Sequence, residues 1–127
     1  MKKKNSILLL IVLTLVALIY FYVQKPHRNI SSEKIEFNLS SDAILNEFLS
    51  NEPLALSRFL DKTIVIYGTL TEINKNFLTL DDNIYCKFDE TIPDIPLNTS
   101  LKIKGRCIGF DMLLEQIKLD QCSILGQ

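Results

Sequence analysis

Apolar residues are concentrated near the start of the chain. Residues 7–23 form an apolar run seventeen residues long, in which Thr14 is the only non-apolar member. As an α-helix this run covers roughly 26 Å, slightly less than the ~30 Å hydrocarbon core of a bilayer. Lys4 and Lys25 flank the run, and their long side chains can reach the lipid headgroups and close the difference. The pattern therefore predicts a transmembrane helix over residues 7–23.

Positive charges flank this run unequally. Lysines at residues 2–4 and the amino terminus place about four positive charges before it, whereas Lys25 and Arg28 place two after it. The positive-inside bias then predicts that residues 1–6 stay in the cytoplasm and that the C-terminal domain lies outside, in the periplasm or its equivalent. The expected location is the inner (cytoplasmic) membrane of a bacterium.

A cleaved signal peptide has a similar layout, with a basic start and an apolar centre. Residues 20–24 (YFYVQ) provide no pair of small residues at which cleavage is expected. The first cysteine is Cys86, too late in the chain to carry a lipoprotein anchor. We therefore favour an uncleaved signal anchor, while both interpretations place the folded part outside the cytoplasm.

After the apolar run, residues 24–40 show neither helical nor strand periodicity and predict a polar linker. Ser40 or Ser41, with Asp42, can begin a helix. An apolar stripe of helical period follows at Ile44, Leu45, Phe48 and Leu49.

Residues 51–53 (NEP) end this first helix, because proline interrupts a helix interior. Pro53 is tolerated in the first turn of a second helix. Apolar residues of that second helix are Leu54, Leu56, Phe59 and Leu60. The domain is thus expected to open with a helical hairpin.

From residue 63 onward the pattern alternates between apolar and polar positions, which is typical of strands. Turns separate the segments, and an eleven-residue loop with two prolines (89–99) precedes the fourth. The five predicted strands are Thr63–Ile73, Phe77–Leu80, 84–88, 101–109 and 117–124.

Five short strands, with a long first strand and a longer connection between the third and fourth, predict a small closed barrel of the OB-fold type. The first strand of such a barrel must bend to pair with two neighbours, and Gly68 lies at its midpoint, where a bend is needed. The expected fold class is mainly β, with N-terminal helices before a five-stranded barrel.

The near-neutral charge of the whole chain, −1, hides an uneven distribution. Residues 30–127 carry nine basic and fifteen acidic side chains, so this part has a net charge of −6. Affinity for nucleic acid rests largely on lysine and arginine releasing counterions from phosphates. The acidic domain is therefore an unfavourable binder of nucleic acid.

The chain resembles the tRNA-anti-like OB-fold family, small bacterial exported or membrane-tethered proteins of unassigned biochemistry. The resemblance lies in the segments NEPLALSRFLDKTIVIYGTLTEI, IYCKF, LKIKGRCIGF and IKLDQCSIL, and covers about residues 42–125. It implies an OB-fold over the expected domain, residues 41–125. The name of the family reflects an analogy of fold and is not evidence of tRNA binding.

Two cysteines fall on neighbouring predicted strands, Cys107 on the fourth and Cys122 on the fifth. Both face the core if a bulge follows Leu119. In an oxidising compartment they can form a disulfide that closes a loop of about 15 residues. A Cys86–Cys122 bond is an alternative, and all three cysteines can instead be small buried apolar residues.

A second group of candidate residues lies on the outer face of the predicted barrel. Aromatic rings beside basic side chains on the middle strands of an OB-fold suit single strands or oligosaccharides, by stacking and by charge. The same lysines also serve as ordinary solvation and edge protection. These candidates are Tyr67, Phe77, Tyr85, Lys87, Lys102, Lys104 and Arg106.

Nothing in the sequence points to an enzyme, a cofactor or a metal. There is no Gly-rich phosphate loop, no Gly-x-Ser-x-Gly and no Cys-x-x-Cys, and the single histidine, His27, lies in the predicted linker. The acidic pairs at residues 81–82 and 89–90 fall in predicted turns, where such residues are common.

The sequence thus predicts a membrane-anchored binding module of the cell envelope, with a protein, peptide or glycan partner. The alternative is a single-stranded nucleic-acid binder, which a steep salt dependence of binding would identify. A structural subunit of a membrane complex, held through residues 7–23, is a third possibility.

Overall fold

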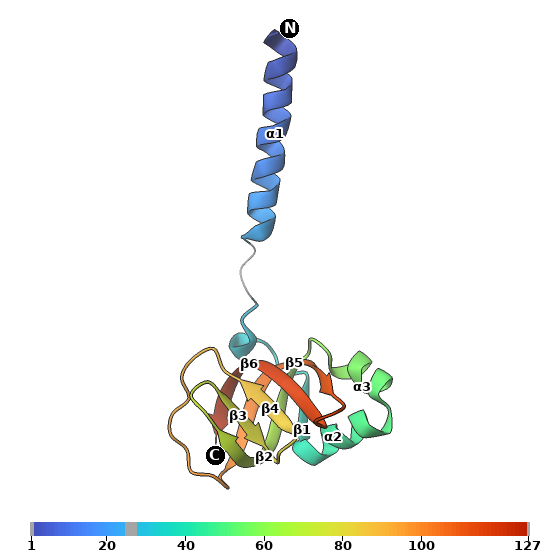
Figure 1. Ribbon diagram of the computed structural model, residues 1–127, viewed down its shortest axis with the longest axis vertical. Helices are drawn as coiled ribbons and strands as arrows, with labels where there is room; N and C mark the ends of the chain where they lie inside the picture. The colour runs from blue at the N-terminus through green and yellow to red at the C-terminus, as the bar shows by residue number, and fades with distance from the viewer. Residues whose placement is uncertain (1, 25–27, 127) are drawn as a thin grey trace.

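The computed structural model describes residues 2–24 and 28–126 (Figure 1). Helix α1 spans Lys2–Val23, and none of its side chains is buried. Its most apolar window has a mean hydropathy of 2.7, so by length and composition it can cross a membrane. The predicted apolar helix is confirmed, whereas Lys25 and His27 lie outside the described residues.

The segment before the helical hairpin is not all linker, and here the sequence-based expectation was wrong. Residues Ile30–Ser32 form a 3-10 turn, η1, and Phe37–Ser40 form a strand, β1. Ile30 is 1% exposed. Strand β1 pairs in parallel with the start of β2 (Thr63–Ile73). Four residues of alternating apolar and polar side chains are too short a pattern to predict a strand from the sequence.

An ion-paired network holds the turn η1 in place. Glu33 accepts hydrogen bonds from Arg28 and from the hydroxyl of Thr63, at 2.8 Å and 2.7 Å. The ammonium of Lys104 donates to the main-chain carbonyls of Ser31 and Glu33. Residues 28–33 are therefore part of the folded domain.

This network should make the stability of the domain depend on pH. The hydrogen bonds from Arg28 and then Thr63 lower the pKa of Glu33 from its usual value of 4.5 to about 2. A lowered folded-state pKa contributes stability above pH 4.5, which is lost as the pH falls from there through 2. We expect Glu33→Gln to flatten this part of the unfolding profile, measured by denaturant titration from pH 5 to pH 2. Glu90→Gln controls for the loss of one charge, and equal slopes in both variants would contradict the expectation.

The helical hairpin forms as predicted and each helix has a side-chain cap. Helix α2 spans Ser41–Ser50, and the side chain of Ser40 accepts a hydrogen bond from the amide of Ala43. Helix α3 spans Glu52–Phe59, and the side chain of Asn51 caps it in the same way. Pro53 lies in its first turn, where no intrahelical donor is lost.

The five predicted strands close into a barrel. Strand β2 is followed by β3 (Phe77–Leu80), β4 (Ile84–Lys87), β5 (Ser100–Asp111) and β6 (Gln116–Gly126). The order is β2-β3-β4-β6-β5, closed by pairing of β5 with β2. Strands β4 and β6 run parallel and the other barrel pairs are antiparallel, which is the OB-fold arrangement.

Gly68 lies where β2 changes neighbours, as expected for the bend. Strands β1 and β3 pair with successive parts of β2. Asp81 bridges the gap between them, because its main chain and carboxylate both bond to Thr69 and its carboxylate also accepts from Ser41. A Cβ atom on Gly68 would lie 2.7 Å from that carboxylate and 2.9 Å from the Cβ of Leu80. The close approach therefore requires glycine.

An aromatic cluster joins the helical hairpin to the barrel. Phe59 packs edge-on against Phe37 with ring centroids 5.0 Å apart, and lies 5.9 Å from Phe48. Phe48 stacks in turn on Phe110 of β5 at 5.0 Å. Figure 1 shows α2 and α3 together beside one part of the barrel. This cluster makes the hairpin a structural part of the domain.

Candidate ligand-binding face

Two of the predicted aromatic residues lie together on the outer surface of β3 and β4. The rings of Phe77 and Tyr85 stack with centroids 5.3 Å apart and an interplanar angle of 26°. The ammonium of Lys118, on the parallel neighbour β6, lies 4.7 Å from the centroid of Tyr85. We call Phe77, Tyr85 and Lys118 the aromatic row, since the three side chains follow one another across three adjacent strands.

The register of the sheet explains this row. Tyr85 is directly opposite Lys118 in the β4–β6 pair, and directly opposite residues share one face of a sheet. Phe77 is opposite Lys87 in the β3–β4 pair, so that exposed lysine flanks the row. All three members of the row are partly exposed. Together with the flanking Lys87, the row offers ring surface, a phenol and two ammonium groups to a ligand.

Lys118 was missing from the sequence-based candidates. The signal for it was present, because Lys118 alternates with the buried residues Ile117 and Leu119 on the last strand. Strand alternation alone does not show that this strand is the neighbour of Tyr85. The crossover that places β6 beside β4 supplies that information.

Tyr67 and Lys102 lie on another part of the barrel, at the seam between β2 and β5. They are directly opposite each other, and the ammonium is 4.9 Å from the ring centroid. Hydrogen bonds with Asn38 and then with Lys102 lower the pKa of the Tyr67 phenol. The pair lines an open groove of about 550 Å³ that also includes Asp81 and the start of α2. The predicted single surface is thus two separate ones.

The other two predicted basic residues do not form an open basic surface. Lys104 is 7% exposed, because η1 covers it and takes its hydrogen bonds. Arg106 forms a bidentate ion pair with Asp120, at 2.9 Å and 2.6 Å. The expectation that Lys104 and Arg106 extend a basic face is therefore corrected: one lysine fixes the chain before the barrel, and the arginine is paired.

The predicted Cys107–Cys122 disulfide is also not formed, and Cys86, Cys107 and Cys122 are each buried free thiols. The bulge after Leu119 does occur, with Gln121 at a φ of 48°. It directs the Cys122 thiol over Gly105. Burial raises the pKa of Cys107 to about 11 and that of Cys122 well above its usual value. Both groups are therefore protonated at neutral pH.

In the described part of the chain, histidine, cysteine and acidic side chains form no group of three able to hold a metal ion. The single histidine of the sequence, His27, lies outside the described residues.

Comparison with known proteins agrees with the fold. The family model tRNA_anti-like matches residues 1–118. A crystal structure of a lipoprotein from Klebsiella pneumoniae subsp. pneumoniae MGH 78578, to which nucleic-acid binding has been attributed, is similar with a TM-score of 0.54 at 13% identity. That similarity covers 81% of this chain and 100% of the other. No curated protein matches the chain. The match over residues 1–118 shows that this chain belongs to the tRNA_anti-like family.

Proposed function

We propose that the protein is a membrane-anchored OB-fold binding module, which works outside the cytoplasm and holds a glycan of the cell envelope on its aromatic row. The observation that carries this proposal is the continuous arrangement of Phe77, Tyr85 and Lys118 on the strands that OB-folds use for binding. The role is binding without a catalytic step.

The chemistry of the row favours a ring-shaped ligand of low charge. Aromatic rings stack on flat apolar faces, and sugars present such faces between their hydroxyl groups. The phenol of Tyr85 and the ammonium groups of Lys87 and Lys118 supply hydrogen-bond donors at the edges. The net charge of −6 over residues 30–127 limits the positive potential at the surface of the domain.

A second candidate is a short single-stranded nucleic acid. Two observations favour it: the similar lipoprotein structure carries that attribution, and a ring pair with lysines also suits stacked bases. The burial of Lys104 and the pairing of Arg106 speak against it, since they remove two cations from the expected basic stripe. The basic side chains that remain beside the rings of Phe77 and Tyr85 are Lys87 and Lys118.

The location outside the cytoplasm rests on α1 and on the charge asymmetry around it. Lysines at residues 2–4 form the start of α1, before its apolar part, and no side chain of this helix is buried. A glycan of the envelope is accessible on that side of the membrane, whereas cytoplasmic nucleic acid is not.

Titration of the full chain in phospholipid nanodiscs tests the choice of ligand. The probes are chito-oligosaccharides and a single-stranded oligothymidylate, each at low and high salt, with binding followed by calorimetry. We expect the oligosaccharide to bind with little dependence on salt. Tyr85→Ala should weaken that binding about 5- to 100-fold, the effect of losing one stacked ring.

Tyr67→Ala provides the matched control, because it removes an exposed tyrosine with a cation–π partner from the other part of the barrel. It should leave the affinity unchanged. Salt-sensitive binding of the oligothymidylate, lost in Tyr85→Ala, would replace the glycan by the second candidate. Equal losses in both variants would contradict the assignment of the row.

A further inference from the structure

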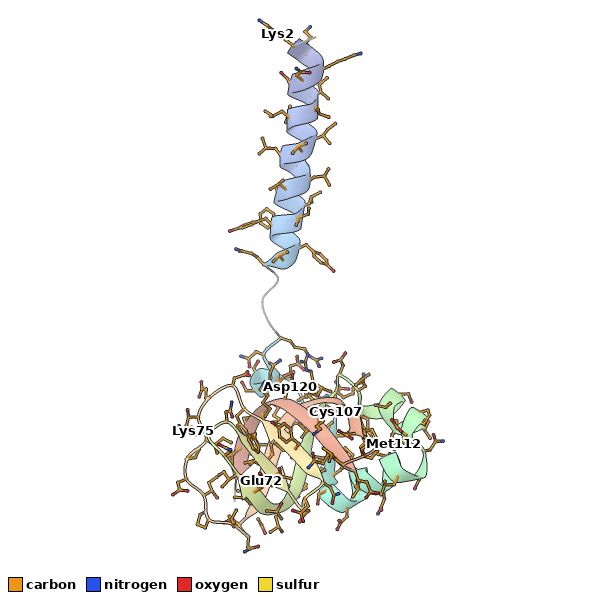
Figure 2. All side chains as sticks on the ribbon, in the orientation of Figure 1. Lys2, Glu72, Lys75, Cys107, Met112 and Asp120 are labelled. Atoms are coloured by element: carbon orange, nitrogen blue, oxygen red, sulfur yellow. The ribbon has the colours of Figure 1, made fainter. Side chains whose placement is uncertain are left out.

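The tip of the β5–β6 hairpin exposes three consecutive aliphatic side chains. Met112, Leu113 and Leu114 are 69%, 96% and 60% exposed. Figure 2 shows Met112 on the side of the domain where α2 and α3 lie. Ile108, which lies on the same hairpin, is 45% exposed. The surfaces of soluble proteins rarely expose three consecutive apolar side chains unless these contact an apolar partner.

The tip is an ordered turn. The carboxylate of Asp111 accepts hydrogen bonds from the amides of Leu113 and Leu114, at 2.9 Å and 3.1 Å. Asn83 donates to the carbonyl of Glu115, which ties the far side of the turn to the β3–β4 connection. The backbone thus holds the three side chains in a protruding position, and little conformational freedom would be lost when they become buried.

The chain re-enters the domain close to the strand that carries this tip. Arg28 donates to the carbonyl of Asp61 at 2.8 Å, and the amide of Asp61 donates to the carbonyl of Cys107 on β5. From Cys107 to Leu113 is six residues of strand and turn, roughly 20 Å. From Val23, the last residue of α1, to Arg28 the chain can extend at most roughly 18 Å. These lengths keep the tip within reach of the bilayer that α1 would span.

We propose that Met112, Leu113 and Leu114 insert into the surface of the bilayer that holds α1, so that the domain is attached to the membrane at two points. This proposal rests on the anchoring role of α1 within the proposed function. It adds a second, reversible contact that orients the barrel. Apolar side chains at the end of a rigid turn can enter the boundary between headgroups and acyl chains without unfolding any backbone.

Charges around the tip select the type of lipid. Asp111 and Glu115 flank the three aliphatic residues, and residues 30–127 have a net charge of −6. An anionic surface would repel this part of the domain. The preferred surface is therefore zwitterionic, and addition of phosphatidylglycerol should weaken the contact of the tip while α1 stays in place.

The absence of tryptophan from the chain allows a direct test. Leu113→Trp introduces a single reporter at the most exposed position, in the full chain reconstituted into phosphatidylcholine vesicles. We expect its emission to shift to shorter wavelength and to be quenched by brominated phosphatidylcholine. The matched control is Leu97→Trp, which replaces another exposed leucine, 53% exposed, in the loop before β5. Its emission should stay at the wavelength of a water-exposed ring and be quenched several-fold less.

Other outcomes would overturn the proposal in distinguishable ways. A shift that grows with the protein-to-lipid ratio, without quenching by brominated lipid, would assign the tip to contact between two copies of the chain. If both variants float with the vesicles and both emit at the wavelength of a water-exposed ring, the tip stays in water. That result would overturn this proposal and leave the anchor intact. Protein that fails to float with the vesicles would overturn the anchor and, with it, this second contact.

Discussion

Replacement of Phe59 by alanine is expected to lower the free energy of unfolding by about 3–5 kcal/mol, the usual cost of removing a buried aromatic ring. Phe59 is 0% exposed and is the central ring between Phe37 and Phe48. Phe48 also stacks on Phe110 of β5. The loss of the Phe59 ring should therefore loosen β1 and both helices from the barrel together. Urea denaturation of the full chain in detergent, followed by circular dichroism, measures the change.

Leu54→Ala is the control for this variant. Leu54 is on the same helix, α3, and its side chain is 58% exposed. Its removal should change the unfolding free energy by about 0.5 kcal/mol or less. Similar losses in the two variants would show that the helical hairpin does not depend on the aromatic cluster.

Replacement of Lys104 by methionine is expected to lower the unfolding free energy by about 2–3 kcal/mol. Methionine fills a similar volume but donates no hydrogen bond, so the carbonyls of Ser31 and Glu33 lose their buried partner. The change should be local, and hydrogen exchange should accelerate mainly in residues 28–40. Lys87→Met, at an exposed position on β4, is the control and should have little effect.

The Lys104→Met variant tests whether residues 24–40 are only a linker or include a folded part of the domain. If residues 24–40 were only a linker, Lys104→Met would behave as Lys87→Met does, and exchange in residues 28–40 would already be fast in the native protein. The structure predicts slow exchange there, because η1 and β1 are packed and hydrogen-bonded.

Much of the barrel could be predicted because each strand alternates regularly and ends at a recognisable turn. Strands β2 and β3 begin and end at the predicted residues, and the other three differ at their ends by one or two. The two helices begin directly after residues that sequence rules favour as caps, Ser40 and Asn51. Local chemistry was sufficient for these elements.

Long-range packing decided what the sequence could not show. Alternation assigns Lys104 to the outside of the barrel, but only the chain folding back as η1 covers it there. In the same way, alternation assigns both Tyr67 and Tyr85 to the outside without saying that they belong to different parts of a closed surface. The bulge at Gln121 decides that the Cys122 thiol lies over Gly105 of β5. Each of these features depends on strand order or register.

The proposed function depends most directly on which side of the membrane the barrel lies. C-terminal fusions of the full chain to alkaline phosphatase and to a fluorescent protein, compared in paired bacterial strains, measure this. An active phosphatase with a dark fluorescent fusion is the expected result, and it would place the aromatic row where envelope glycans are found. A bright fluorescent fusion with an inactive phosphatase would contradict the proposal and make oligonucleotides the ligands to test on Phe77 and Tyr85.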